Sequence, residues 1–178
     1  MKNWKILSKK NILDSKWLRV DKEVCQLPNC KVISDFYTLW QPDWVLILAK
    51  NFQGKWVLAS QYRHGTQKTS LEFPAGIIDS GETPIDAAKR ELQEECAYAK
   101  GNWTLIGELP MNPDRHRGRF FVVYAEGVEK FQETRFDDSE NIETVLIETE
   151  VLLEKIKEGI FVHPHQIAGF YLWQLKQS

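Results

Sequence analysis

The chain has 178 residues, of which 43% are hydrophobic and 27% charged, and its formal net charge at pH 7 is -2. These values suit one soluble globular domain with a short N-terminal extension, and no apolar run approaches the roughly 20 residues that a membrane span requires. The weak charge gives no general attraction to nucleic acid or anionic membranes, so we expect neither as a partner. Without a signal-like apolar stretch or a cysteine framework, the sequence predicts a cytoplasmic protein.

The early chain contains two expected strands. Trp17–Val20 and Lys31–Tyr37 alternate apolar and polar letters on either side of a turn at Pro28-Asn29. Cys25 and Cys30 flank this turn, and they are either ordinary turn neighbours or two ligands of a metal site that would need two more. We expect residues 1–40 to form an N-terminal β extension and residues 41–178 to form the main domain.

A buried hairpin is expected next. Val45–Ala49 and Trp56–Ala59 are nearly continuous apolar runs separated by Asn51–Gly54, which indicates strands covered on both faces. The later pattern mixes strands and helices without strict βαβ alternation, so it predicts a mixed sheet with helices on its faces. The expected later elements are strands at Trp103–Leu109, Arg119–Ala125 and Glu143–Ile147, and helices at Thr149–Glu158 and Gln166–Leu175.

The stretch from Thr83 to Cys96 has the pattern of an amphipathic helix. Thr83 can cap its start, Pro84 occupies the first turn, and one apolar stripe is formed by Ile85, Ala88, Leu92 and Cys96. Glu91 and Glu95 are four residues apart, so their carboxylates lie together on one flank of that stripe and repel each other. The pair is either a solvated acidic face or a site for a hard cation such as Mg²⁺, which binds carboxylates together with phosphate oxygens.

The spacing of this segment resembles the Nudix box, G-x5-E-x7-R-E-U-x-E-E-x-G-U with U apolar. Six of its fixed letters would coincide by chance in about one of ten million windows at average residue usage of roughly 7%. The matching residues are Gly76, Glu82, Arg90, Glu91, Leu92, Glu94, Glu95 and Tyr98. The resemblance implies a Nudix fold of the α/β (mixed α+β) class, in which a mixed β-sheet is sandwiched between helices.

One position departs from the box, because Ala97 stands where the family has glycine. Alanine enters the left-handed conformation of a helix end at a cost of roughly 1 kcal/mol. Either Ala97 adopts that conformation, or the helix runs slightly longer.

The resemblance also implies roles for individual residues. Glu91, Glu95 and the backbone carbonyl of Ala75 would bind Mg²⁺, with Mn²⁺ as an alternative, and Glu94 would assist directly or through water. Arg90 would orient the carboxylates by bidentate pairing, and Glu82 would support that network from the preceding loop.

Flanking motifs are similar to the ADP-ribose and nucleoside diphosphate sugar pyrophosphatase branch. Gln61-Tyr62-Arg63 is followed by Leu71–Gly76, which implies that Arg63 and Glu72 belong to the substrate site, with Arg63 on a phosphate. Pro113 lies close to where ADP-ribose-cleaving members carry a proline. The basic loop around it, which includes Arg115, departs from the acidic loop of those members and would hold a terminal phosphate or a different sugar. The simpler alternatives are a surface ion pair for Arg63 and a plain basic turn for the loop.

Two further groups complete the expected site. An acidic loop would supply the general base or an extra metal ligand, with Glu140 as first choice and Asp138 as second; a surface acidic loop is the alternative. Trp40 and Phe36 would stack against the base, although core packing is the commoner use of such rings. In this branch the N-terminal strands pack on a partner subunit, which implies a homodimer.

Taken together, these features predict a Mg²⁺-dependent pyrophosphohydrolase that cleaves a nucleoside diphosphate sugar, with ADP-ribose favoured, to a nucleoside monophosphate and a sugar phosphate. One alternative is a Nudix enzyme for dinucleoside polyphosphates or oxidised nucleotides. Another, from a different class, is a non-catalytic nucleotide sensor, but the intact box glutamates argue against it. His163-Pro164-His165 is expected to cap the last helix and not to bind a metal.

Overall fold

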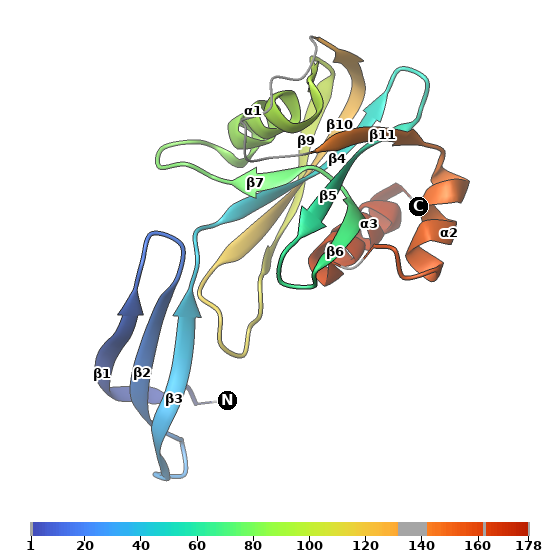
Figure 1. Ribbon diagram of the computed structural model, residues 1–178. Coiled ribbons are helices and arrows are strands. Elements are labelled where there is room, and N and C mark those ends of the chain that lie inside the picture. Colours follow the sequence, from blue (N-terminus) through green and yellow to red (C-terminus); the bar gives the residue numbers. More distant parts are fainter. Residues whose placement is uncertain (1, 132–141, 162, 178) are drawn as a thin grey trace. The chain divides into compact units, whose positions relative to one another are not determined.

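The computed structural model describes residues 2–131, 142–161 and 163–177 (Figure 1). These residues group into two compact units, which are described separately. The first unit consists of the chain up to Asp43 together with the segment Leu109–Arg119. The second unit consists of Trp44–Glu108 together with the chain from Phe120 onward. The segment Leu109–Arg119, expected in the main domain, therefore groups with the N-terminal strands.

The first unit is built on an antiparallel sheet in the order β1-β2-β3. Its strands span Lys5–Asp14, Arg19–Gln26 and Val32–Trp40. The β2 strand alternates in burial, and its buried side chains include two acids, Asp21 and Glu23. Arg117, from the later segment, pairs with Glu23, while its backbone N–H donates to Leu39 O at 2.8 Å. These contacts hold the later segment beside β3.

The second unit contains a large mixed sheet. Its main order is β11-β5-β4-β10-β8, with β6 pairing β5, β7 pairing β4 and β9 pairing β10. β4 runs antiparallel to β5 and parallel to β10. The strands span Trp44–Asn51 (β4), Trp56–Arg63 (β5), Lys68–Glu72 (β6), Ala75–Ile77 (β7), Tyr98–Ala99 (β8), Asn102–Pro110 (β9), Arg119–Lys130 (β10) and Glu143–Ile147 (β11). The predicted mixed sheet is confirmed.

Helices cover both faces of this sheet (Figure 1). Alternate residues of β4 point to opposite faces, so Ile47 packs in the cluster that includes Leu92 of α1 (Pro84–Cys96). On the other face, α3 (Pro164–Gln177) comes so close to the sheet that a Cβ at Gly169 would overlap the Leu46 side chain. The α2 helix (Thr149–Lys157) buries Leu152. Strands covered on both faces explain the continuous apolar runs in the sequence.

The boundaries of α1 follow its local sequence. The Thr83 hydroxyl accepts a hydrogen bond from Asp86 N–H at 3.2 Å, which caps the helix start next to Pro84. The helix ends at Cys96, because Ala97 adopts the left-handed conformation with φ 57° and ψ 33°. The alternative that the helix runs longer is therefore wrong.

Several predicted elements need correction. Trp17 and Leu18 precede β2, and β1 was not expected at all. The short strands β6, β7 and β8 were also missed. Within the described ranges, no helix has both the length and the apolar character needed to cross a membrane.

Candidate active site

Strand β7 and helix α1 approach closely at Gly76. A Cβ at this position would overlap the carboxyl group of Glu91, so a larger residue would displace that side chain. One turn further along α1, the Glu95 carboxylate accepts a hydrogen bond from Ala75 N–H at 3.2 Å. Glu91 and Glu95 therefore both lie against the backbone of Ala75-Gly76, as their spacing on one helix flank predicts.

Arg90 connects two glutamates of this helix with one in the loop before it. Its Nε and Nη2 atoms donate to the two Glu82 carboxylate oxygens at 3.0 and 2.9 Å, and Nη1 donates to Glu91 at 2.7 Å and to Glu94 at 3.2 Å. Nη2 also donates to Ile77 O at 2.9 Å. The hydrogen bond from Arg90 lowers the pKa of the Glu82 carboxyl, and Glu82 in turn contributes most to raising the pKa of Arg90. The charged forms of both the Glu82 carboxylate and the Arg90 guanidinium are thus favoured.

This donor set fits a hard divalent cation. Within the described ranges, no three His, Cys, Asp or Glu side chains converge on one metal position. Mg²⁺, however, commonly uses only one or two carboxylates and takes its other ligands from phosphate and water. Glu91, Glu95 and the Ala75 carbonyl meet that requirement, because both side chains lie against the Ala75-Gly76 backbone.

A pocket of about 280 Å³ adjoins this edge of β7. Arg63 lies on its wall, and the guanidinium pairs with Glu72 through Nε at 3.0 Å and Nη2 at 2.7 Å. The structure therefore brings Arg63 and Glu72 together beside Ala75, and Arg63 forms an ion pair, although with a buried carboxylate and not with a surface one. The Glu72 side chain is 2% exposed and that of Arg63 is 41% exposed, so the arginine is the member that solvent and ligand can reach.

The same pocket has walls that the sequence did not identify as part of the site: Trp44, His163 and Gln166. His163 directly precedes α3, and its carbonyl accepts from Gln166 N–H at 3.1 Å, consistent with its expected place at the helix start. Burial and then the nearby His165 lower the pKa of His163, which favours a neutral imidazole there. Gln166 is buried on the same side of α3 as Phe170 and Trp173, but its place on that helix does not identify its partners.

The remaining expected substrate residues lie in the first unit. The Arg115 guanidinium stacks 4.8 Å from the Phe36 ring and donates to Tyr37 O at 3.3 Å, so these two residues contact each other. Trp40 lines a separate pocket of about 230 Å³ together with the cations Lys9, Arg19 and Arg117 and the acids Asp14 and Asp21. Pro113 is exposed.

The two candidates for the general base, Glu140 and Asp138, lie outside the described residues.

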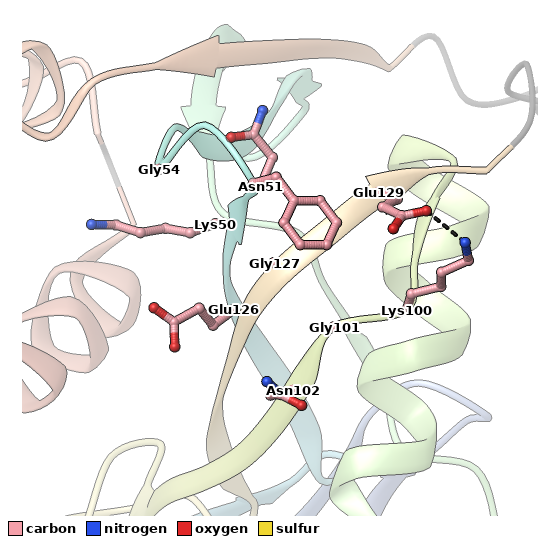
Figure 2. A pocket seen from close by; sticks show the side chains of 10 residues that line it. Lys50, Asn51, Gly54, Lys100, Gly101, Asn102, Glu126, Gly127 and Glu129 are labelled. Carbon is pink, nitrogen blue, oxygen red and sulfur yellow. Dashed lines mark hydrogen bonds and ion pairs between the residues drawn. The ribbon is translucent and has the colours of Figure 1, made fainter.

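A larger hollow of about 570 Å³ lies elsewhere on the second unit (Figure 2). It is lined by the β4–β5 turn and by parts of the segments around Lys100 and Glu126, and no acid of α1 takes part. Lys100 pairs with Glu129 at 2.6 Å, and the Lys50 ammonium sits 4.5 Å from the Trp56 ring centroid. These polar groups stabilise their own strands and turns, and the hollow is separate from the glutamate site.

Comparisons with known proteins agree with this geometry. Residues 40–167 match the NUDIX domain family. An ADP-ribose pyrophosphatase from Bacillus subtilis (strain 168) is 30% identical over 175 residues, covering 98% of this chain and 94% of the relative. A methanol dehydrogenase activator from Bacillus methanolicus is 25% identical over the same shares of the two chains.

Among solved structures, an ADP compounds hydrolase superposes with a TM-score of 0.87 at 21% identity, covering 100% of this chain and 97% of the other. That likeness confirms the predicted fold. The matched domain and the full-length relative confirm the predicted family: the chain belongs to the Nudix family and is a Nudix hydrolase.

Proposed function

We propose that this enzyme hydrolyses the diphosphate bridge of a nucleoside diphosphate sugar, with ADP-ribose as the favoured substrate and Mg²⁺ as the metal. The single observation that carries the proposal is the placement of Arg63 on a pocket wall beside Ala75 and Gly76, the segment against which Glu91 and Glu95 lie. Arg63 thus shares its pocket with the backbone segment that both proposed metal-binding carboxylates contact. The named activity of the Bacillus subtilis relative supports ADP-ribose.

Different residues would hold the metal ion and orient its ligands. Glu91, Glu95 and the Ala75 carbonyl would hold the cation, which screens the diphosphate charge and lowers the pKa of the attacking water. Arg90 holds Glu82, Glu91 and Glu94 in a fixed arrangement, so that the carboxylates need not reorganise during the reaction.

Hydrolysis forms one bond from the water oxygen to a phosphorus atom and breaks the bond from that phosphorus to the bridging oxygen. The proton of the water passes to a base, for which Glu140 is the first candidate and Asp138 the second. Arg63 binds a phosphate of the same bridge as its charge develops. The products are a nucleoside monophosphate and a sugar phosphate.

Trp40 is our candidate for the residue that stacks against the base. Its ring is 43% exposed, as stacking requires, and it shares its pocket with Lys9, Arg19 and Arg117 and with the acids Asp14 and Asp21. Pro113, Phe36 and Arg115 would shape the loop and strand around that ring.

We further propose a homodimer formed through the N-terminal strands. Every residue of β1 is exposed, and the same unit exposes a set of large apolar side chains, namely Trp4, Ile6, Leu7, Ile12, Leu13 and Trp17. Exposed apolar area of this kind is typical of subunit interfaces. Light scattering at micromolar concentration should give twice the mass of the chain, and a monomer would refute the dimer.

The three cysteines are unpaired, which supports a reducing cytoplasm as the place of action.

A substrate panel tests the function. With purified protein and Mg²⁺, phosphorus NMR should show ADP-ribose converted to AMP and ribose 5-phosphate, and no conversion after chelation of the metal. The panel includes GDP-mannose, other nucleotide sugars, NADH and diadenosine polyphosphates. If nucleotide sugars are inert while dinucleoside polyphosphates or nucleoside triphosphates react, the substrate class proposed here is wrong.

A further inference from the structure

Gln166 makes an unusual set of buried contacts at the start of α3. Its side chain is buried, with the residue 1% exposed. The amide oxygen accepts from Phe73 N–H at 2.7 Å, and the amide nitrogen donates to Phe73 O at 3.1 Å and to a Glu72 carboxylate oxygen at 3.3 Å. One side chain thus satisfies both backbone groups of Phe73 and also reaches a buried carboxylate.

Glu72 connects Gln166 to Arg63 through hydrogen bonds. The same carboxylate oxygen that accepts from Gln166, Oε2, accepts from Arg63 Nη2 at 2.7 Å, and Oε1 accepts from Arg63 Nε at 3.0 Å. Both distances are short enough for charge-assisted hydrogen bonds, so the planar guanidinium is held as a fork on the carboxylate. A continuous chain of hydrogen bonds therefore runs from α3 through β6 to the end of β5.

We propose that Gln166 is a positioning residue for substrate recognition, acting through Glu72 to fix the Arg63 guanidinium on the wall of the pocket for a diphosphate-bearing ligand. This inference rests on the function proposed above, which gives Arg63 its phosphate.

The chemistry of residue 166 explains why a glutamine serves here. A buried carboxylate is stabilised by hydrogen-bond donors, and the Gln166 amide supplies one without adding a second positive charge. Lys or Arg at this position would compete with Arg63 for Glu72. A neutral amide does not compete for the negative charge of Glu72, which therefore pairs with the Arg63 guanidinium. Because this pairing already restricts the Arg63 side chain, less conformational entropy is lost when a ligand binds.

The connection also explains how the C-terminal helix takes part in the site. Gln166 and Phe73 are 93 residues apart in sequence, yet the amide fixes the backbone of Phe73, two residues before Ala75. Glu95 holds the Ala75 N–H on the other side of the same segment. The segment that carries the proposed metal-binding carbonyl, at the start of β7, is thereby restrained by a helix from each face of the sheet.

The test replaces Gln166 with methionine, which keeps the length of the side chain but removes its hydrogen bonds. We expect Gln166→Met to lower kcat/KM for ADP-ribose by about tenfold or more, and Gln177→Met, an exposed glutamine of the same helix, to leave it unchanged. Gln166→Glu keeps an acceptor for Phe73 N–H but places a like charge beside Glu72, so it should also lower kcat/KM.

A double-mutant cycle separates positioning from general destabilisation. If Gln166 acts mainly through Arg63, the fold-loss in kcat/KM caused by Gln166→Met should be several times smaller in an Arg63→Ala background than in wild type. Equal fold-losses in the two backgrounds would overturn the proposal, because they would mean that Gln166 acts independently of Arg63.

A second readout does not depend on turnover. The Nε–H resonance of Arg63, identified by its loss in Arg63→Lys, should shift and exchange faster with water in Gln166→Met and in Gln166→Glu, but not in Gln177→Met. An unchanged resonance in a folded Gln166 variant would contradict the proposal. If wild-type protein cleaves no nucleoside diphosphate sugar, the proposed function fails, while this resonance still decides whether Gln166 positions Arg63.

Discussion

Gly76 on β7 and Glu91 on α1 share one small space, in which a Cβ at position 76 would overlap the glutamate carboxyl group. The absence of a side chain at position 76 lets Glu91, which we propose as a metal ligand, reach the backbone of Ala75-Gly76.

We therefore expect Gly76→Ala to reduce turnover by about a hundredfold with little loss of stability. The end of a flexible glutamate side chain can move away at small cost, but the displaced carboxylate would no longer serve a cation beside Ala75. Gly65→Ala is the matched control, because a Cβ there meets no atom within 4 Å. Kinetics and thermal unfolding of both variants give the measurement, and normal turnover in Gly76→Ala would contradict the role given to Glu91.

The buried carboxylate of Asp21 should make the stability of the N-terminal sheet depend on pH. Hydrogen bonds, above all from Lys9, lower the pKa of Asp21 to about 2 from an ordinary value of 3.8. A lowered pKa in the folded state means that the charged form stabilises the fold above pH 3.8, and that this contribution disappears as the pH falls toward about 2.

Asp21→Asn should therefore unfold at lower denaturant concentration than wild type at pH 7, and the difference should shrink as the pH falls below about 4. Asp35→Asn, at an exposed position of β3, is the control and should show no such pH-dependent difference. A difference for Asp21→Asn that is the same at pH 7 and at pH 2.5 would rule out this assignment.

Ala97 provides a test of backbone strain. Its φ of 57° is unfavourable for alanine, so Ala97→Gly should raise the free energy of unfolding, by less than about 1 kcal/mol because glycine also gains freedom in the unfolded chain. Ala99→Gly, two residues later in β8, should instead destabilise the protein. Denaturant unfolding of the two variants compares the signs, and destabilisation in both would refute strain at Ala97.

The sequence predicted those parts of the fold whose signals are local. The β4–β5 hairpin and α1 have long apolar patterns, a turn and a cap, and they were located within a few residues. The β1 strand was missed because it is exposed throughout, so no buried alternation marks it. The strands β6, β7 and β8 are 5, 3 and 2 residues long, too short for any periodic pattern to develop.

In the candidate site, too, the sequence identified the residues with local signals and missed those brought together by folding. The Nudix box locates Arg90 and the glutamates because they lie on one helix and the loop before it. Gln166 could not be assigned, because its partners Glu72 and Phe73 lie more than 90 residues away and become neighbours only when α3 packs on the sheet. The side-chain pairing of Arg115 with Phe36 likewise depends on the later segment folding against β3.

The most direct test of the central claim is the turnover of Glu91→Gln and Glu95→Gln. Each change removes a charge that would bind the cation but keeps the shape of the side chain, and metal activation contributes several kcal/mol to transition-state stabilisation. With Mg²⁺ and ADP-ribose, we expect each variant to lose at least about a hundredfold in kcat while its unfolding midpoint stays near that of wild type. Glu154→Gln, at an exposed position of α2, is the control and should keep full activity. Near wild-type turnover in either Glu91→Gln or Glu95→Gln would contradict the assignment of the metal site to α1.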